Sequence, residues 1–209
     1  MLRKYITESK AIRFEGNNYS EEWKVEALKR GLTNVTNPVE AFDAYLSESS
    51  QKLFSGLDVM THRENEARTH VKLDYFTKRI QIESRILGDL VINHIVPVGI
   101  RYQSELMKNV KGLKDLFSEE EFKELAGARL NLIREISQHI TYIKARVNEM
   151  IEARKVANKI EDVREKAMAY ATTIFCFFED IRYHIDKLEL IVDDEYWPLP
   201  KYRELLFIK

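Results

Sequence analysis

The sequence predicts an all-α fold, an elongated helical bundle in which several short helices precede three long, antiparallel helices with coiled-coil-like seams. Glycine and proline number only 7 and 4 in 209 residues, whereas a chain of many strands needs such residues at its turns. Capping motifs precede two of the long stretches. Apolar residues then recur at alternating steps of three and four, which is the spacing of a helical seam.

Residues 1–60 are predicted to hold several short helices. A helix over 20–30 begins with a serine cap and two acids and is followed by a glycine, features that favour its two ends. Asn37 and the proline after it start a second short helix, which ends near Leu46. A further turn is expected over 49–55.

The first long helix is predicted to begin at a capping box at Thr61 and to continue to about Val110. Lys111 and Gly112 are expected to break it, and Pro97 should bend it. At ~1.5 Å per residue, a helix of about fifty residues is ~75 Å long. The molecule is therefore expected to be elongated.

The second and third long helices each carry an apolar seam. A capping box at Ser118 opens the second, whose seam is Ile133, Ile136, Ile140, Ile143, Val147 and Met150. The seam of the third is Ala167, Ala171, Ile174, Phe178, Ile181, Ile185, Leu188 and Val192. A polar stretch at 158–162 joins them, which predicts an antiparallel hairpin, and the first long helix is expected to pack on the same seam.

Three parts are expected along the chain: the short-helix segment 1–60, the long-helix bundle 61–195 and a tail, 196–209, that packs back on the bundle. Additional apolar residues widen the stripe of the third long helix, namely Tyr170, Phe175, Phe177 and Ile191. Such a wide stripe indicates a second packed neighbour or a partner surface. A seam left uncovered would instead drive self-association.

Composition excludes several classes of protein. Lys and Arg total 33 against 34 Asp and Glu, and no dense basic run occurs, so the sequence predicts no nucleic-acid binding. The longest uncharged stretches, 90–100 and 167–178, are too short to cross a bilayer, and no signal peptide is recognised. A single cysteine, Cys176, excludes an internal disulfide, and a cytoplasmic protein is expected. Its apolar sequence neighbours predict a buried thiol of little reactivity.

One segment near the N-terminus has a family-specific pattern. Residues 14–23 read Phe-Glu-Gly-Asn-Asn-Tyr-Ser-Glu-Glu-Trp, followed by Glu-Ala at 26–27 and Lys-Arg-Gly-Leu at 29–32. This pattern resembles the segment after the catalytic core of type III glutamine synthetases. Asn18 stands where the family pattern has glycine. Further agreement is found at 37–42, 53–54, 75–84, 95–97 and Tyr102.

The resemblance covers roughly residues 12–117 and implies the C-terminal helical region of such a synthetase. The parent enzyme joins ammonia to glutamate with ATP and a divalent metal, magnesium, bound by a catalytic part upstream. The resemblance therefore implies no catalytic, cofactor-binding or metal-binding residue here. Because the family forms rings, it implies a structural role in a homo-oligomer, with the catalytic domain and other subunits as partners. The alternative is a free-standing helical regulator or scaffold that binds intact synthetase subunits.

Four aromatic residues are candidate interface residues. Tyr19 and Trp23, four apart on the predicted first helix, bracket acids and are suited to a partner surface or, equally, to local packing. Tyr196 and Trp197 begin the tail.

An independent enzyme within the bundle is disfavoured. The chain lacks the paired Glu-x-x-His motifs of a di-iron site, and its glycines are too far apart for a phosphate-binding loop. Glu135 with His139 and Asp180 with His184 are four apart. Each pair suits half of a metal site or, more commonly, ordinary surface pairing.

Overall fold

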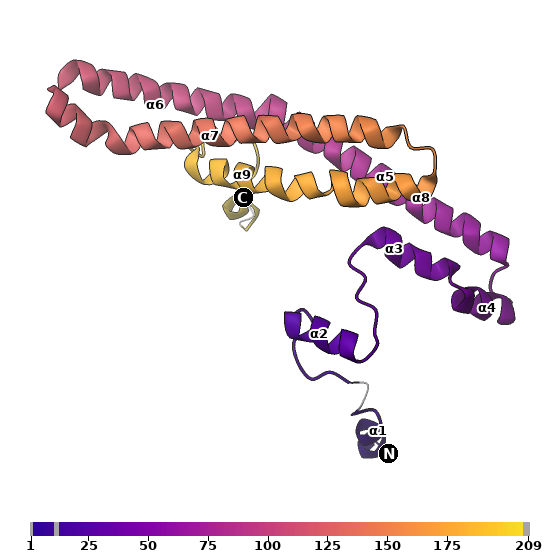
Figure 1. Ribbon diagram of the computed structural model, residues 1–209. Coiled ribbons are helices and arrows are strands. Elements are labelled where there is room, and N and C mark those ends of the chain that lie inside the picture. The colour runs from indigo at the N-terminus through magenta and orange to yellow at the C-terminus, as the bar shows by residue number, and fades with distance from the viewer. Residues whose placement is uncertain (1, 11–12, 207–209) are drawn as a thin grey trace.

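A computed structural model describes residues 2–10 and 13–206 (Figure 1). All regular structure in these ranges is helical, which confirms the all-α class. Three long helical rods dominate the molecule and make it elongated. The rods are α5 (His62–Leu90) continued by α6 (Val96–Leu116), then α7 (Glu119–Asn158), then α8 (Val163–Ala169) continued by α9 (Cys176–Ile191).

The rods alternate in direction. Figure 1 shows α7 running antiparallel to α6 and to α9, and it packs closely against both. Only the second half of the first rod, α6, packs closely along α7. The first half, α5, packs mainly against α8 and the π-helical turn Tyr170–Ile174. The predicted hairpin of the second and third rods is therefore present, while the first rod divides its contacts between its two neighbours.

The predicted capping boxes begin two of the rods. At the start of α5, the Thr61 backbone N–H donates to the Glu64 carboxylate at 2.8 Å, and the Glu64 N–H donates to the Thr61 hydroxyl at 3.3 Å. Ser118 and Glu121 make the same reciprocal pair at the start of α7. Each box satisfies N–H groups that have no partner inside the helix.

The first rod ends later than the sequence predicted. The break expected at Lys111 and Gly112 is wrong, because α6 continues to Leu116 and ends at the extended Phe117. A glycine inside a helix costs only about 1 kcal/mol, which the flanking turns can offset. Pro97 is accommodated by a π-helical turn, Val91–Ile95, directly before α6. Proline has no N–H to donate to the carbonyl four residues earlier, and its ring clashes with that carbonyl in a regular α-helix. The wider π-helical turn avoids both problems.

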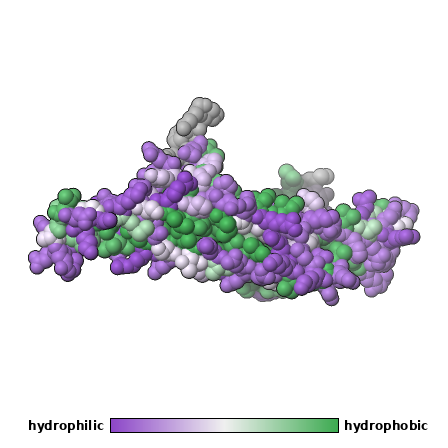
Figure 2. Space-filling model, turned by 90° about the horizontal axis from the view of Figure 1, so that it is seen from above, coloured by the Kyte–Doolittle hydropathy of each residue, from purple (hydrophilic) through white to green (hydrophobic). Residues whose placement is uncertain are grey.

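The main core lies where α7 meets α6 and α9. Five predicted seam residues of α7 are buried there: Ile136, Ile140, Ile143, Val147 and Met150. Gly99 lets α6 approach closely, because a Cβ at that position would lie 3.1 Å from the Ile140 Cδ1 atom. On the face shown in Figure 2, hydrophobic residues gather near the middle of the molecule and the two ends are largely hydrophilic.

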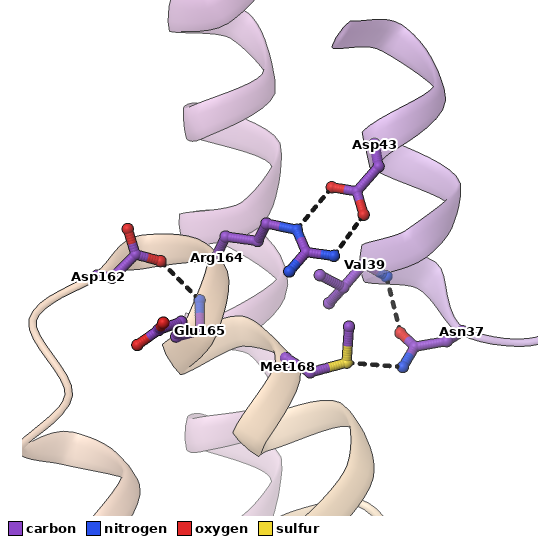
Figure 3. Close-up of polar contacts among 7 residues, drawn as sticks. All are labelled: Asn37, Val39, Asp43, Asp162, Arg164, Glu165 and Met168. Atoms are coloured by element: carbon purple, nitrogen blue, oxygen red, sulfur yellow. Dashed lines mark hydrogen bonds and ion pairs between the residues drawn. The ribbon is translucent and has the colours of Figure 1, made fainter. Parts of the chain in front are cut away.

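A second, smaller core joins the short helices to the rods. Val39 of α3 (Pro38–Asp43) is buried against Leu73 and Ala167. Beside it, the Arg164 guanidinium donates to both carboxylate oxygens of Asp43 at 2.8 and 2.6 Å (Figure 3). A three-residue 3₁₀ turn and α4 (Glu48–Gly56) follow α3 and lead into the first rod.

The tail after α9 lies against the rods. Trp197 is only 8% exposed and belongs to the main core, with Leu199 packed beside it. Tyr196 is partly exposed, and its ring centroid lies 6.2 Å from that of Tyr102. A short helix, α10 (Tyr202–Leu205), follows, and the last three residues of the predicted tail lie outside the described residues.

Candidate interface surfaces

The segment before α3, which we call the arm, consists of residues 2–10 and 13–36. It contains α1 (Leu2–Glu8) and α2 (Glu21–Lys29). Ala27 is the single buried residue among its described positions. Several large apolar residues on it are instead exposed: Leu2, Tyr5, Ile6, Tyr19, Val25 and Leu28. The arm therefore presents apolar surface without a core of its own.

Local bonds hold the arm in a defined shape. The Arg13 guanidinium donates to the carbonyl of Ile6 at 2.8 Å, and Arg30 donates to the carbonyl of Arg13 at 3.2 Å. Gly31, with a φ of +77°, ends α2 in the left-handed conformation that glycine adopts without strain. These contacts join Arg13 to α1 and to the end of α2.

Only Trp23 of the predicted pair Tyr19 and Trp23 lies on the helix. Trp23 lies within α2 and packs on Phe14, with ring centroids 4.6 Å apart. Tyr19 precedes the Ser20 cap, and its N–H donates to the side chain of Asn17 at 3.0 Å. Helical spacing therefore does not apply to Tyr19, which lies outside the helix and is 95% exposed.

Tyr196 and Trp197 differ in exposure. Trp197 is buried in the main core of its own chain, so its side chain stabilises the fold. Tyr196 stands at the edge of the same region, beside Tyr102.

A groove of ≈ 720 Å³ opens between α5 and α9, with Trp197 and Leu199 of the tail among its lining residues. Ile86 and Phe175 in its wall are 54% and 51% exposed. Phe175 also borders a smaller hollow beside Asn37 at the start of α3. Phe175 therefore forms part of the wall of both hollows. The wide apolar stripe of the third long helix, which includes Phe175, was the sign of this groove in the sequence. The wall that α5 contributes was not predicted.

Sequence analysis singled out two acid–histidine pairs, and the structure places the histidines of these pairs next to each other. The Nδ1 atoms of His139 and His184 are 2.7 Å apart, and the Glu135 carboxylate lies 3.8 Å from the His139 Nε2 atom. Asp180, however, is bound to the Arg146 guanidinium. Among the residues that the structure describes, no group of three or more His, Cys, Asp or Glu side chains is placed to hold a metal ion.

Comparison with known proteins agrees with the resemblance of the N-terminal segment. The family model described as "Glutamine synthetase C-terminal domain" matches residues 1–114. A glutamine synthetase of Bacteroides fragilis (strain YCH46) is 49% identical over all 209 residues, which cover 29% of that protein. The chain belongs to the glutamine synthetase C-terminal domain family.

Two other relatives agree with this assignment. A glutamine synthetase of Butyrivibrio fibrisolvens is 24% identical over 99% of the chain and 29% of the relative. A type-3 glutamine synthetase of Dictyostelium discoideum is 26% identical over 94% of the chain and 27% of the relative. This glutamine synthetase C-terminal domain thus spans less than a third of the length of each of these relatives.

The family model covers the arm and the first rod of the glutamine synthetase C-terminal domain, and the Bacteroides relative extends the match through α7 and α9. Asn18, which replaces the expected glycine, does not have a positive φ; Asp58 is the one described residue other than glycine that does. The loop therefore does not need glycine at this position.

The prediction that the Cys176 thiol is buried is wrong. Cys176 is exposed, and its thiol donates to the carbonyl of Thr172 at 3.0 Å. Its sequence neighbours are apolar, but the core face of this rod passes through Ile174 and Ile181. A residue two positions after Ile174 is turned well away from that face.

None of the helices formed by the described residues is both long enough and apolar enough to cross a membrane.

Proposed function

We propose that this chain is the C-terminal domain of a type III glutamine synthetase, that it is not catalytic by itself, and that it holds subunits together. The parent reaction would be the ATP-dependent ligation of ammonia to glutamate, carried out by a part of the polypeptide outside this chain. The observation that carries the proposal is the arm, whose apolar side chains are exposed although the rods have a buried core of their own.

An arm of this kind is not expected to remain uncovered in a working protein. Val25 and Leu28 of α2 are 69% and 61% exposed and lie on one side of that helix, three residues apart. Exposed apolar patches on soluble proteins mark contact surfaces. Because the relatives are more than three times as long as this chain, the catalytic part or a neighbouring subunit is the natural partner of α2.

The described residues of this domain do not fit the magnesium that the parent reaction needs. Magnesium at a phosphoryl-transfer site is held by carboxylates placed close together. The described residues offer no cluster of three or more potential metal ligands. We therefore propose that magnesium is bound by the catalytic part of the polypeptide.

The assembly role is tested in the full-length synthetase. The double substitution Val25→Asp with Leu28→Asp should lower the size of the assembly in light scattering, because it places two carboxylates in the proposed contact. Leu116→Asp, a change at an apolar residue that is at least as exposed and lies at the far end of the rods, is the control and should leave the assembly intact. An unchanged assembly in the Val25 and Leu28 variant would contradict the role of the arm.

The non-catalytic part of the proposal has its own test. The 209-residue chain should form no glutamine from glutamate and ammonia with ATP and magnesium. Measurable turnover would contradict it.

The size of the native polypeptide in source cells distinguishes the alternative of a free-standing regulator. A band at 24.7 kDa would support the regulator, whereas a much larger band would support a domain of the synthetase.

A further inference from the structure

The groove between α5 and α9 has an acidic border. Four carboxylates line it, those of Glu83, Glu179, Asp186 and Glu189, against a single guanidinium, that of Arg182. Glu83 is paired with Arg79 at 2.9 Å, and Asp186 with Arg182 at 3.6 Å. In the described part of the chain, no cation lies within 4.0 Å of the Glu179 or Glu189 carboxylate. An apolar floor with surplus negative charge favours an apolar, basic ligand.

Helix α1 has the complementary character. Leu2, Tyr5 and Ile6 lie on one face, at the i, i+3, i+4 spacing, and Leu2 is 79% exposed. Arg3, Lys4 and Lys10 outnumber the single acid, Glu8, in residues 2–10. A helix of seven residues with no buried side chain is not stable in water without a packing partner. Helix α1 therefore needs an apolar, acidic surface.

The arm directs α1 away from the groove of its own chain. The bonds from Arg13 to Ile6 and from Arg30 to Arg13 tie α1 to the linker and to α2. Figure 1 shows this assembly projecting from the rods, with α1 at its far end. In this position α1 is accessible to another molecule.

We propose that α1 of one copy of this chain docks in the groove between α5 and α9 of a second copy. Helix α1 is short enough for the groove, since at ~1.5 Å per residue it is about 10 Å long, whereas the helical stretch from Phe175 to Glu189 is about 21 Å long. Exchange of arms between two copies gives a closed, two-fold contact. The inference rests on the proposed assembly function, for which it names one contact between subunits.

Charge reversal on each side of the contact tests the docking. The arm variant is Arg3→Glu with Lys4→Glu, and the groove variant is Glu179→Lys with Glu189→Lys, both in the 209-residue chain. At an ionic strength of about 50 mM, where screening is weak, sedimentation velocity should show that each variant associates at least about tenfold more weakly than the wild type. An equimolar mixture of the two variants should associate again, because the reversed arm fits the reversed groove of the other copy.

Matched controls carry the same charge changes elsewhere. Lys111→Glu with Lys114→Glu, and Glu120→Lys with Glu124→Lys, alter exposed residues near the turn between α6 and α7 and should associate like the wild type. Circular dichroism of every variant checks that the helices are intact.

Three results would overturn the docking: a wild type that stays monomeric up to about 1 mM, association unaffected by both reversals, or a mixture that fails to recover. These results leave the test of Val25 and Leu28 in the full-length enzyme untouched. The docking and the general assembly role can therefore fail separately.

Discussion

The Nδ1 atoms of His139 and His184 lie 2.7 Å apart, so a hydrogen bond between two imidazole rings joins α7 to α9. At least one ring must be neutral, because one nitrogen has to accept. Burial lowers the pKa of His184, the charge of His139 lowers it further, and Asp180 raises it. The Tyr142 ring covers His184 at 4.0 Å between centroids. The junction of the two rods is thus built for a neutral His184.

Acid is expected to destabilise the domain through this pair. The unfolded chain binds a proton at His184 with an ordinary pKa of about 6.5, whereas the folded-state pKa is lower. The contribution of His184 to stability is therefore complete above about pH 6.5 and is lost as the pH falls from there through the folded-state pKa. Urea unfolding between pH 7.5 and pH 5 should show this decline.

A pair of variants isolates the contribution of His184. His184→Gln should flatten the decline and cost about 1 kcal/mol at pH 7.5 through the lost hydrogen bond. His70→Gln, a change at an exposed histidine, should keep the wild-type dependence on pH. Equal slopes in the wild type and His184→Gln would refute the explanation.

The contact between Asp43 and Arg164 should couple the two residues energetically. The hydrogen bond from Arg164 lowers the pKa of Asp43, and the geometry is bidentate, which is the stronger form of such a pair. Both side chains are more than a third exposed, so water and salt screen them. A double-mutant cycle with Asp43→Asn and Arg164→Gln should give about 0.5–1 kcal/mol of coupling.

Salt provides the control for this cycle. The coupling should shrink in 1 M salt, where the Debye length is about 3 Å. A coupling near zero at low salt would show that the ion pair adds nothing to the contact of α3 with α8, which also includes the buried Val39 and the hydrogen bond from the Asn37 side chain to the Met168 sulfur at 3.1 Å.

Gly112 and Gly99 should respond to substitution in opposite directions. No atom lies within 4 Å of a Cβ built at Gly112, so Gly112→Ala should stabilise α6 by about 0.5–1 kcal/mol through helix propensity. Gly99→Val should destabilise by about 1–3 kcal/mol, because the added methyl groups meet Ile140 in a close-packed core. Thermal unfolding of both variants gives the comparison. Destabilisation by Gly112→Ala would mean that this part of α6 is not helical in solution.

These residues show how far sequence reasoning reaches. Caps such as those at Thr61 and Ser118 depend on residues three apart, and a seam depends on helical spacing, so both could be recognised from local sequence. Gly112 was misjudged because a weak intrinsic preference was treated as a stop. Cys176 was misjudged because sequence neighbours in a helix do not share a face.

Features formed by distant segments were out of reach. The groove needs Ile86 of α5 and Phe175 before α9 to be placed opposite one another, and neither position alone indicates this. The meeting of His139 with His184 depends on the register of two rods. By contrast, the apolar spacing of Leu2, Tyr5 and Ile6 was present in the sequence and was overlooked.

Trp197 and Tyr196 provide a test of the tail. Trp197 is buried in the main core, so Trp197→Ala should destabilise the domain by about 3–5 kcal/mol, the loss expected for a buried aromatic side chain. Tyr196→Ala removes a neighbouring, partly exposed ring and should cost less than about 1 kcal/mol. Chemical unfolding of the two variants under the same conditions measures the difference. Similar small effects of both changes would mean that the tail is not packed on the rods in solution and that both aromatic residues are free to contact a partner.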